Sequence, residues 1–309
     1  MQSLEKKIVA WGPIFIFIAA MLWATDAPFR YHLTRNLSAS FIVLAEHAVN
    51  VLLILPFLFL QRHEIKSLNW KQWLALVVIG VGASAMASIL FTKTFAFVNP
   101  SVAIVLQKLQ PLIVIALATT FLREKLSKYF WPWAMLALAS AYIISFPDLR
   151  PQLYYGETWN PNVIGVLLAV GAATLWGLGT VLGRFALGTS VSFQTVTALR
   201  FFIAFLFLMA LNVRSDVLAT LGTLTGKDAF FIVIVAITSG FTSLFIYYRG
   251  LQTTKASIAT FAELGFPFLA VVINSVTLGF FLKPLQIIGM LFLLLAIWGL
   301  TRINQSAVI

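Results

Sequence analysis

The sequence predicts an all-α integral membrane protein whose ten transmembrane helices form two inverted five-helix repeats around a central cavity. Three observations predict this fold class. First, 61% of the 309 residues are hydrophobic and only 10% are charged, whereas soluble chains carry about a quarter charged residues. Second, the apolar residues gather in ten segments separated by polar connections. Third, short motifs of the first half recur in the same order in the second half.

Each apolar segment is close to the ~20 residues that an α-helix needs to cross the hydrocarbon core of a bilayer. We expect helices over residues 12–33, 39–60, 72–93, 102–122, 130–146, 163–187, 191–212, 229–249, 256–278 and 284–301. The longest connections leave no room for a soluble domain. The chain therefore divides into a first repeat at 10–146, an external linker at 147–162 and a second repeat at 163–302.

The recurrence is clearest in short motifs at matching points of the two halves. Ala20–Trp23 in the first segment corresponds to Ala173–Trp176 in the sixth, and Ser38–Phe41 corresponds to Ser190–Phe193. Because each repeat contains an odd number of spans, the second must lie inverted in the membrane relative to the first. Inverted repeats around a site at the midplane are typical of alternating-access transporters. The alternative is a duplication that serves only the structure.

The distribution of lysine and arginine predicts the orientation. The formal charge is +11, but the charges stand singly or in small groups between apolar segments, as membrane-flanking charges do. The connections on the side of the N-terminus hold the larger share, including Lys6, Lys7, Arg62, Lys66 and Lys71. We therefore expect both termini in the cytoplasm and the protein in a plasma membrane, the inner membrane of a bacterium. No basic block points to nucleic acid as a partner.

The sequence carries no motif of an enzyme or a metal site. It has no cysteine, and its histidines are scattered at His32, His47 and His63, which argues against a bound metal. The HExxH, GxSxG and P-loop patterns are absent. We therefore expect no catalytic residues, no cofactor and no metal.

One stretch and its counterpart bring polar groups into the fourth and ninth segments. Residues 101–111 and 257–267 both begin with serine and end with proline. Pro111 and Pro267 are expected to kink their helices and to leave the carbonyls of Gln107 and Glu263 without their helical N–H partners. Irregular backbone inside a membrane has to be covered by protein or water, so we expect both helices to line a solvated cavity. The alternative is a pair of kinked helices that serve only packing.

Ionisable side chains inside predicted spans are costly, and they usually face a cavity or another charge. Asp26 stands one helical turn before Arg30, either as a local ion pair at the interface or as a substrate gate. Glu46 lies beside His47, a combination able to relay protons if both side chains reach one site. Arg200 is either a substrate clamp or a structural tie to carbonyls at helix ends, and we favour the tie.

Lys108 and Glu263 stand at matching depths of the fourth and ninth segments. A buried ammonium and a buried carboxylate each need a partner, so they either neutralise each other or bind the two ends of a zwitterion. An unpaired Glu263 would make a proton a partner in transport, whereas a paired one supports uncoupled facilitation or exchange, which we favour. Trp176 and Tyr248 are further candidates for the cavity, although aromatic residues near span ends most often lie at the membrane interface.

The sequence resembles the drug/metabolite transporter superfamily, and specifically its EamA-type members, over almost its whole length. The resemblance is carried by Leu22-Trp23, Leu175-Trp176, Arg200-Phe201, Asn99-Pro100-Ser101, Pro111 and Phe121-Leu122-Arg123-Glu124. The second repeat departs from this pattern at Thr254-Lys255-Ala256-Ser257 and at Gly279-Phe280. The resemblance implies a basket-like bundle with a central cavity and the export or exchange of small metabolites.

These observations together predict a secondary transporter that moves a small polar or amphipathic metabolite, such as an amino acid, outward by alternating access. Its partners are then the small-molecule substrate and the lipid bilayer. The alternative, favoured by the cations Lys108 and Arg200, is an exchanger of anionic metabolites of the nucleotide-sugar or sugar-phosphate kind. A membrane-embedded enzyme that modifies lipids is a more remote alternative.

Overall fold

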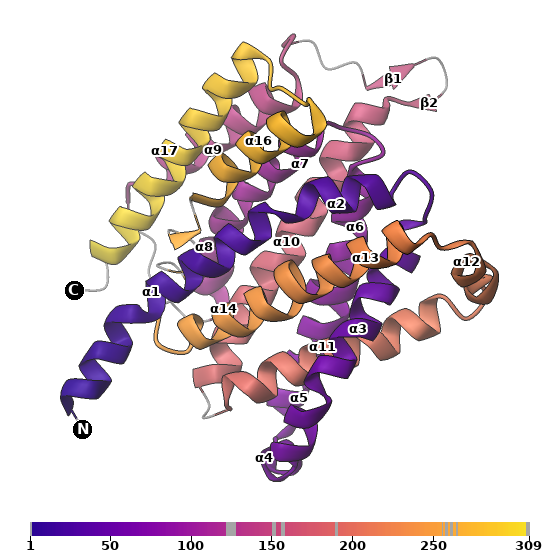
Figure 1. The fold of residues 1–309 in the computed structure, drawn as a ribbon. Coiled ribbons are helices and arrows are strands. Elements are labelled where there is room, and N and C mark those ends of the chain that lie inside the picture. The colour runs from indigo at the N-terminus through magenta and orange to yellow at the C-terminus, as the bar shows by residue number, and fades with distance from the viewer. Residues whose placement is uncertain are drawn as a thin grey trace.

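The computed structural model describes residues 2–121, 128–149, 153–155, 158–188, 191–254, 256, 259, 262–263 and 265–306. This part of the chain is a bundle of helices with one short β-hairpin (Figure 1). Some residues of the motifs above fall outside it, namely Leu122, Arg123, Glu124, Ser190, Lys255 and Ser257.

Seven of the described helices are long and apolar enough to cross a membrane: Trp11–Leu33, Ala39–Leu60, Trp70–Thr94, Pro100–Leu117, Pro161–Leu187, Phe193–Leu211 and Gly226–Leu251. Phe130–Ser145, Gly265–Leu278 and Pro284–Gly299 are shorter apolar helices. Large apolar side chains point outward, and Leu52, Phe59 and Val276 are 68%, 71% and 82% exposed. Such an extensive exposed apolar surface fits lipid. The all-α membrane architecture is thus confirmed, and the count of ten spans stays a prediction.

The described residues of the first half form helices joined by short turns. Its elements are α1 (Gln2–Ala24), α2 (Asp26–Leu33), α3 (Ala39–Leu60), α4 (Arg62–Ser67), α5 (Trp70–Val78), the π-helix η1 (Ile79–Met86), α6 (Ala87–Thr94), α7 (Pro100–Leu106), the 3₁₀-helix η2 (Gln107–Leu109), α8 (Gln110–Phe121) and α9 (Phe130–Ser145). Polar side chains cap the N-termini of several helices. The Ser38 hydroxyl accepts a hydrogen bond from the Phe41 N–H at the start of α3, and Asn69 forms a capping box with Gln72 at the start of α5. These side chains bind N–H groups that a helix leaves free.

The second half begins with a hairpin in which β1 (Tyr154–Tyr155) pairs antiparallel with β2 (Thr158–Trp159). The helices that follow are α10 (Pro161–Gly188), α11 (Phe193–Leu211), α12 (Val217–Thr223), α13 (Gly226–Val235), the π-helix η3 (Ala236–Thr242), α14 (Ser243–Leu251), α16 (Gly265–Leu278) and α17 (Pro284–Ser306). Ser192 caps α11, and Thr225 forms a capping box with Asp228 at the start of α13.

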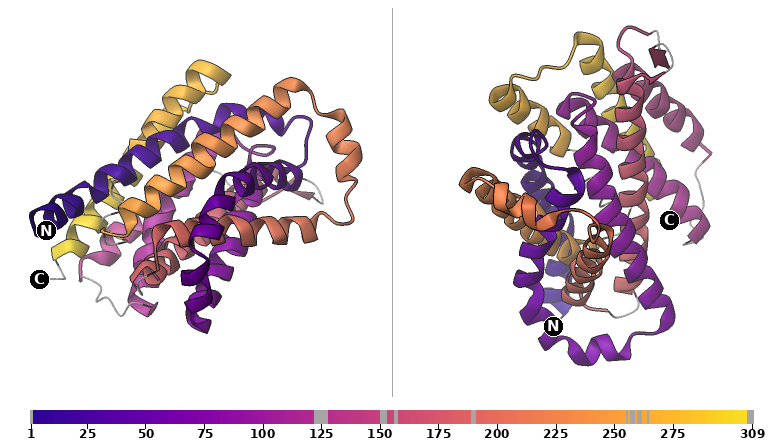
Figure 2. Two further views of the ribbon diagram at one scale, coloured as in Figure 1. Left: turned by 60° about the horizontal axis from the view of Figure 1, so that its bottom comes forward. Right: turned by 90° about the vertical axis from the view of Figure 1, so that its right-hand side faces the viewer.

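Helices from the two halves pack against each other rather than forming separate bodies. α1 packs against α14 and α16, α3 against α11, and α10 against α6 and α8. In Figures 1 and 2, α1 runs beside the α13–α14 helix, while α9 and α17 lie together at one edge of the bundle. The start of α1 and the end of α17 lie at the same end of the molecule (Figure 1). The core is shared as well, since one cluster joins Ile16 and Leu76 to Leu199, Tyr248 and Leu251.

The helical geometry is interrupted at corresponding places in the two halves. The third predicted segment contains the π-helix η1, and the eighth contains the π-helix η3. The fourth contains the 3₁₀-helix η2, and the ninth departs from α-helix at Glu263, just before α16. Such interruptions cost backbone hydrogen bonds and often mark functional sites.

The expectation that two carbonyls are left free by the prolines is wrong. The Gln107 carbonyl accepts the N–H of Gln110, three residues on. The Glu263 carbonyl accepts the N–H of Phe266 in the same way, at 3.1 Å. Because a 3₁₀ bond reaches one residue less than an α-helical bond, the chain satisfies both carbonyls before it reaches Pro111 or Pro267. The prolines therefore tighten the helices locally instead of exposing backbone acceptors.

The contact between α1 and α14 predicts a stability effect. A Cβ atom at Gly250 would lie 2.6 Å from the Gly12 carbonyl oxygen and 2.8 Å from Cγ1 of Ile16. Because small residues let helix backbones approach closely, glycine at this position allows α1 and α14 to pack together. We expect Gly250→Ala to lower stability by about 1–3 kcal/mol, seen as a lower unfolding temperature in detergent. Gly222→Ala is the control, because nothing lies within 4 Å of its added methyl. Equal stability of the two variants would contradict the close approach.

The predicted orientation has a direct chemical test, because the chain contains no cysteine. Tyr154 in β1 is 53% exposed, and Lys66 in α4 is exposed. If both termini are cytoplasmic, a membrane-impermeant thiol reagent should label Tyr154→Cys in intact cells and Lys66→Cys only after lysis. The reverse pattern would require the opposite orientation.

Candidate functional site

One cavity collects many of the buried charged and polar groups of the described residues. Its cavity volume is about 150 Å³, which is less than the ~300–1,000 Å³ typical of small-molecule sites. Its walls come from both halves of the chain, and they include η1, η2 and η3. The irregular helices described above therefore all border this space.

Every candidate side chain predicted from the sequence lines this cavity. They are Asp26, Glu46, Gln107, Lys108, Trp176, Arg200, Tyr248 and Glu263. His47 and Asn50 line it too, whereas Pro111 and Pro267 do not belong to its lining. Their role in binding substrate stays a prediction, but the chain does bring them together.

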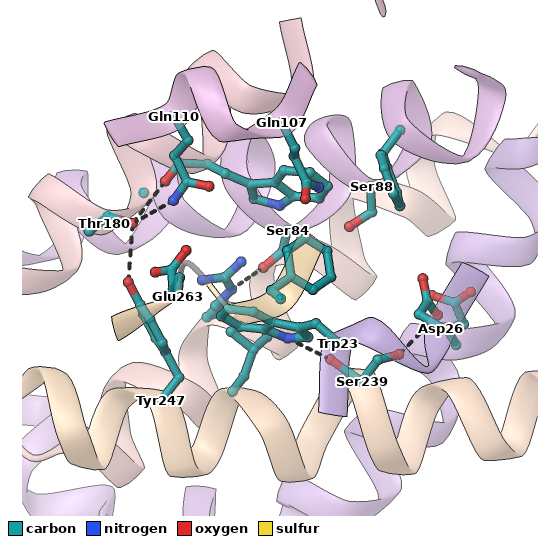
Figure 3. Close-up of a pocket in the computed structure, with 18 of the residues that line it drawn as sticks. Trp23, Asp26, Ser84, Ser88, Gln107, Gln110, Thr180, Ser239, Tyr247 and Glu263 are labelled. Carbon is teal, nitrogen blue, oxygen red and sulfur yellow. Dashed lines mark hydrogen bonds between the residues drawn. The ribbon is translucent and has the colours of Figure 1, made fainter. Parts of the chain in front are cut away.

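Arg30 is the centre of a buried ion cluster at one end of the cavity. Its guanidinium lies 2.6 Å from Asp26 Oδ2 and 2.8 Å from Glu46 Oε1, and it donates to the Thr92 hydroxyl at 2.8 Å. Asp26 Oδ1 also accepts a hydrogen bond from the Ser239 hydroxyl at 2.9 Å (Figure 3). The predicted local pair of Asp26 and Arg30 is present, and the cluster extends it to α3, α6 and η3.

Lys108 and Glu263 form the second ion pair, which joins η2 to the segment before α16. Lys108 Nζ lies 3.5 Å from Glu263 Oε2 and 4.6 Å from the centre of the Phe266 ring. Both side chains are almost fully buried, at 2% exposure each. Of the two sequence-based alternatives, mutual neutralisation is the arrangement present in this state of the protein.

Arg200 is bound to helix η1 and to α14. Its guanidinium donates to the Ala83 carbonyl at 3.1 Å, to the Ser84 hydroxyl at 2.5 Å and to the Tyr248 hydroxyl at 2.8 Å. A π-helix displaces carbonyls from regular helical pairing, and a guanidinium with several donors can satisfy them. These contacts agree with the structural tie that the sequence favoured.

Aromatic rings form much of the remaining wall. Trp23 lies 5.2 Å from Tyr247, and Phe91 lies 5.3 Å from Trp176, measured between ring centres. The Trp23 indole donates to the Ser239 carbonyl at 3.1 Å (Figure 3), which fixes the plane of its ring. Rings held in this way offer flat apolar faces to a bound solute.

Apart from Glu46 Oε1, which forms an ion pair with Arg30, three polar atoms of the cavity lining are buried without a hydrogen-bond partner among the described residues. They are Glu263 Oε1, His47 Nε2 and Asn50 Oδ1. The other ring nitrogen of His47, Nδ1, lies 2.8 Å from the Val43 carbonyl. Because a carbonyl can only accept, Nδ1 holds the proton and Nε2 of the neutral ring is an acceptor. All three unpaired atoms are therefore acceptors, and a solute or a water molecule can donate a hydrogen bond to each of them.

Small polar side chains of the lining were not found from the sequence. They are Ser84, Ser88, Gln110, Thr180 and Ser239. Thr180 illustrates the reason: its hydroxyl meets both the Gln110 amide and the Tyr247 hydroxyl at 3.3 Å (Figure 3). Serine and threonine also satisfy themselves on their own helix carbonyls, so their presence in an apolar segment does not identify a cavity.

The model of the EamA-like transporter family matches residues 10–146 and 163–302. The chain belongs to the EamA-like transporter family. This confirms the resemblance inferred from the motifs, and the protein is an integral membrane transporter.

Two relatives extend the comparison over nearly the full length. The riboflavin transporter ImpX of Fusobacterium nucleatum subsp. nucleatum is 28% identical over 313 residues, covering 95% of this chain and 98% of that protein. A solved crystal structure with 14% identity superposes with a TM-score of 0.65 over 95% of this chain and 96% of the other. The second likeness concerns the fold alone.

The buried ion pair of this transporter predicts strong coupling between its members. Lys108→Met leaves the Glu263 carboxylate buried without its cation, which should cost about 3–5 kcal/mol. Adding Glu263→Gln removes the orphaned charge and should restore most of the unfolding temperature in detergent. The exposed pair of Lys283 and Asp148, 3.4 Å apart, is the matched control. Lys283→Met should have little effect there, and additive losses from Lys108→Met and Glu263→Gln would contradict the pairing.

Proposed function

We propose that this transporter carries a neutral, planar heteroaromatic solute that bears hydrogen-bond donors, with riboflavin as the candidate substrate. The observation that carries the proposal is the charge balance of the cavity. Its lining holds three cations, Arg30, Lys108 and Arg200, and three anions, Asp26, Glu46 and Glu263. The formal charges cancel, and the carboxylates already lie beside cations. A neutral solute enters such a site without separating any ion pair.

The walls and the unpaired acceptors support the same class of solute. The rings of Trp23, Phe91 and Trp176 suit a flat aromatic system. The unpaired acceptors suit a solute with N–H and O–H groups, and riboflavin has both, on its ring and on its ribityl chain. A phosphate or a carboxylate would bring further acceptors to atoms that need donors. The 28% identical relative, a riboflavin transporter by name, points to the same compound.

The ion pairs also support a proposal for the mode of transport. Because Glu263 lies beside Lys108, we propose that it is a fixed part of the site and that transport is uncoupled facilitation or exchange by alternating access. The concentration gradient then sets the direction, so outward movement occurs wherever the internal concentration is higher. We place the protein in a bacterial inner membrane with both termini in the cytoplasm, on the distribution of lysine and arginine.

A zwitterionic amino acid is the second candidate, and one observation favours it. Lys108 and Glu263 present opposite charges 3.5 Å apart in the same cavity, and they could bind the carboxylate and the ammonium of an amino acid after separating. An exchanger of anionic metabolites is less well supported. The excess of cations that suggested it is balanced by Asp26 and Glu46 in the same lining.

A ligand panel on the purified protein tests the proposal. Riboflavin should raise the unfolding temperature, since a ligand stabilises the folded state by mass action, and it should drive counterflow in proteoliposomes. Flavin mononucleotide, which adds a phosphate, should bind at least about tenfold more weakly. Trp176→Leu should weaken riboflavin binding, whereas Trp131→Leu, at a site 66% exposed outside the cavity, should not. Stabilisation by amino acids but not by riboflavin would replace the first candidate with the second.

A further inference from the structure

We propose that His47 and Asn50 on α3 form a hydroxyl-binding subsite for the polyol part of the solute, separate from the region that takes its ring system. This inference rests on the proposed function, because it assigns the two parts of a riboflavin-like solute to two parts of one cavity. It is carried by the placement of two buried, unpaired acceptors on the same wall.

The His47 ring is fixed in place at the wall of the cavity and has one nitrogen without a partner among the described residues. The side chain is 4% exposed, and Nδ1 is bound to the Val43 carbonyl one turn earlier on α3. The Phe201 ring of α11 packs edge-on against the imidazole, with 5.6 Å between ring centres. Nε2 is buried and has no partner among the described residues. A preorganised acceptor of this kind binds an O–H donor without any rearrangement of its own.

Asn50 lies one turn further along α3 and faces helix η3. It is 1% exposed, and Oδ1 has no partner within the described part of the chain. Its amide packs against Gly240, where an added Cβ would lie 3.0 Å from Nδ2 and 3.2 Å from Oδ1. Glycine at this position therefore leaves room for the amide beside the backbone of η3. Two acceptors one turn apart on the same helix can each take a hydroxyl donor from one short polyol chain.

This subsite lies towards one end of the cavity. Gly240 follows Ser239, which binds Asp26. In Figure 3, Ser239 and Asp26 stand at the opposite end of the view from Glu263, Thr180 and Tyr247. Trp23 and Gln107 lie between the two ends. A solute that spans the cavity thus meets Glu263 at one end, aromatic rings in the middle and the α3 acceptors towards the other.

The chemistry of the subsite defines the group that it takes. Both free atoms are acceptors, so they select hydroxyl or amide donors. A phosphate at the end of the same tail keeps the other hydroxyl donors, but it brings a charge that is costly to bury beside these acceptors. The subsite therefore distinguishes riboflavin from its phosphorylated form at the tail, in addition to any selection at the ring.

The test compares riboflavin with lumiflavin, which has the same ring system and a methyl group in place of the polyol. Wild-type protein should bind riboflavin about tenfold or more tightly than lumiflavin, as expected for one or two hydrogen bonds to buried acceptors. In Asn50→Leu and in His47→Phe the preference should shrink to about threefold or less, with the affinity for lumiflavin unchanged. Binding is measured by fluorescence quenching of the flavin on purified protein.

The matched control is Asn274→Leu. Asn274 is fully buried and its Oδ1 is also unpaired within the described residues, but it binds Ser101 outside the cavity lining. This variant should keep the wild-type preference, which separates the subsite from a general effect of removing a buried amide. If one α3 variant fails to fold, the other still measures the preference.

Each outcome decides the proposal. Equal weakening of riboflavin and lumiflavin in both α3 variants would overturn the subsite while leaving flavin transport in place. If wild-type protein binds neither flavin, the proposed function fails, and ribitol becomes the probe of the subsite. Stabilisation of the wild type by ribitol that is lost in Asn50→Leu would still support the hydroxyl subsite. Absence of that stabilisation would overturn it.

Discussion

The burial of charge in a medium that cannot solvate it is the constraint on which this structure depends. Each charged group inside the bilayer needs a partner within the protein, and the partners here come from different helices. Arg30 joins α2 to Glu46 on α3 and to Thr92 on α6. Lys108 joins η2 to Glu263. The ion pairs therefore hold the walls of the cavity in position.

The backbone obeys the same constraint. Inside a membrane, a helix can depart from α geometry only where another group satisfies the displaced N–H and carbonyl groups. The departures before Pro111 and Pro267 close with bonds to the N–H three residues on. Helix η1 instead receives Arg200, which binds the Ala83 carbonyl. These three carbonyls beside the cavity are thus satisfied, and the unpaired acceptors described above belong to side chains.

The sequence predicted the architecture and the charged residues of the cavity for a simple physical reason. Apolar runs of span length and ionisable residues within them are rare enough to be specific, so Glu46, Lys108 and Glu263 were recognised. The partners were harder to predict, because the contact between Arg30 and Glu46 depends on how α2 and α3 pack. Ser84, Thr180 and Ser239 gave no signal, since hydroxyl groups are common in membrane helices and bond locally. The carbonyls of Gln107 and Glu263 were misjudged because 3₁₀ bonding was not anticipated.

The arrangement of charges also bears on what such a cavity can select. A zwitterion would have to draw Lys108 away from Glu263 before it could use either group, and it would then replace a contact of 3.5 Å with two new ones. The new contacts would have to offset the separation of a buried pair, which is costly in a low dielectric. A neutral solute avoids this step and gains from pairing acceptors that are otherwise unsatisfied. The free energy available for selectivity therefore comes from the unpaired atoms of Glu263, His47 and Asn50, and not from the net charge of the site.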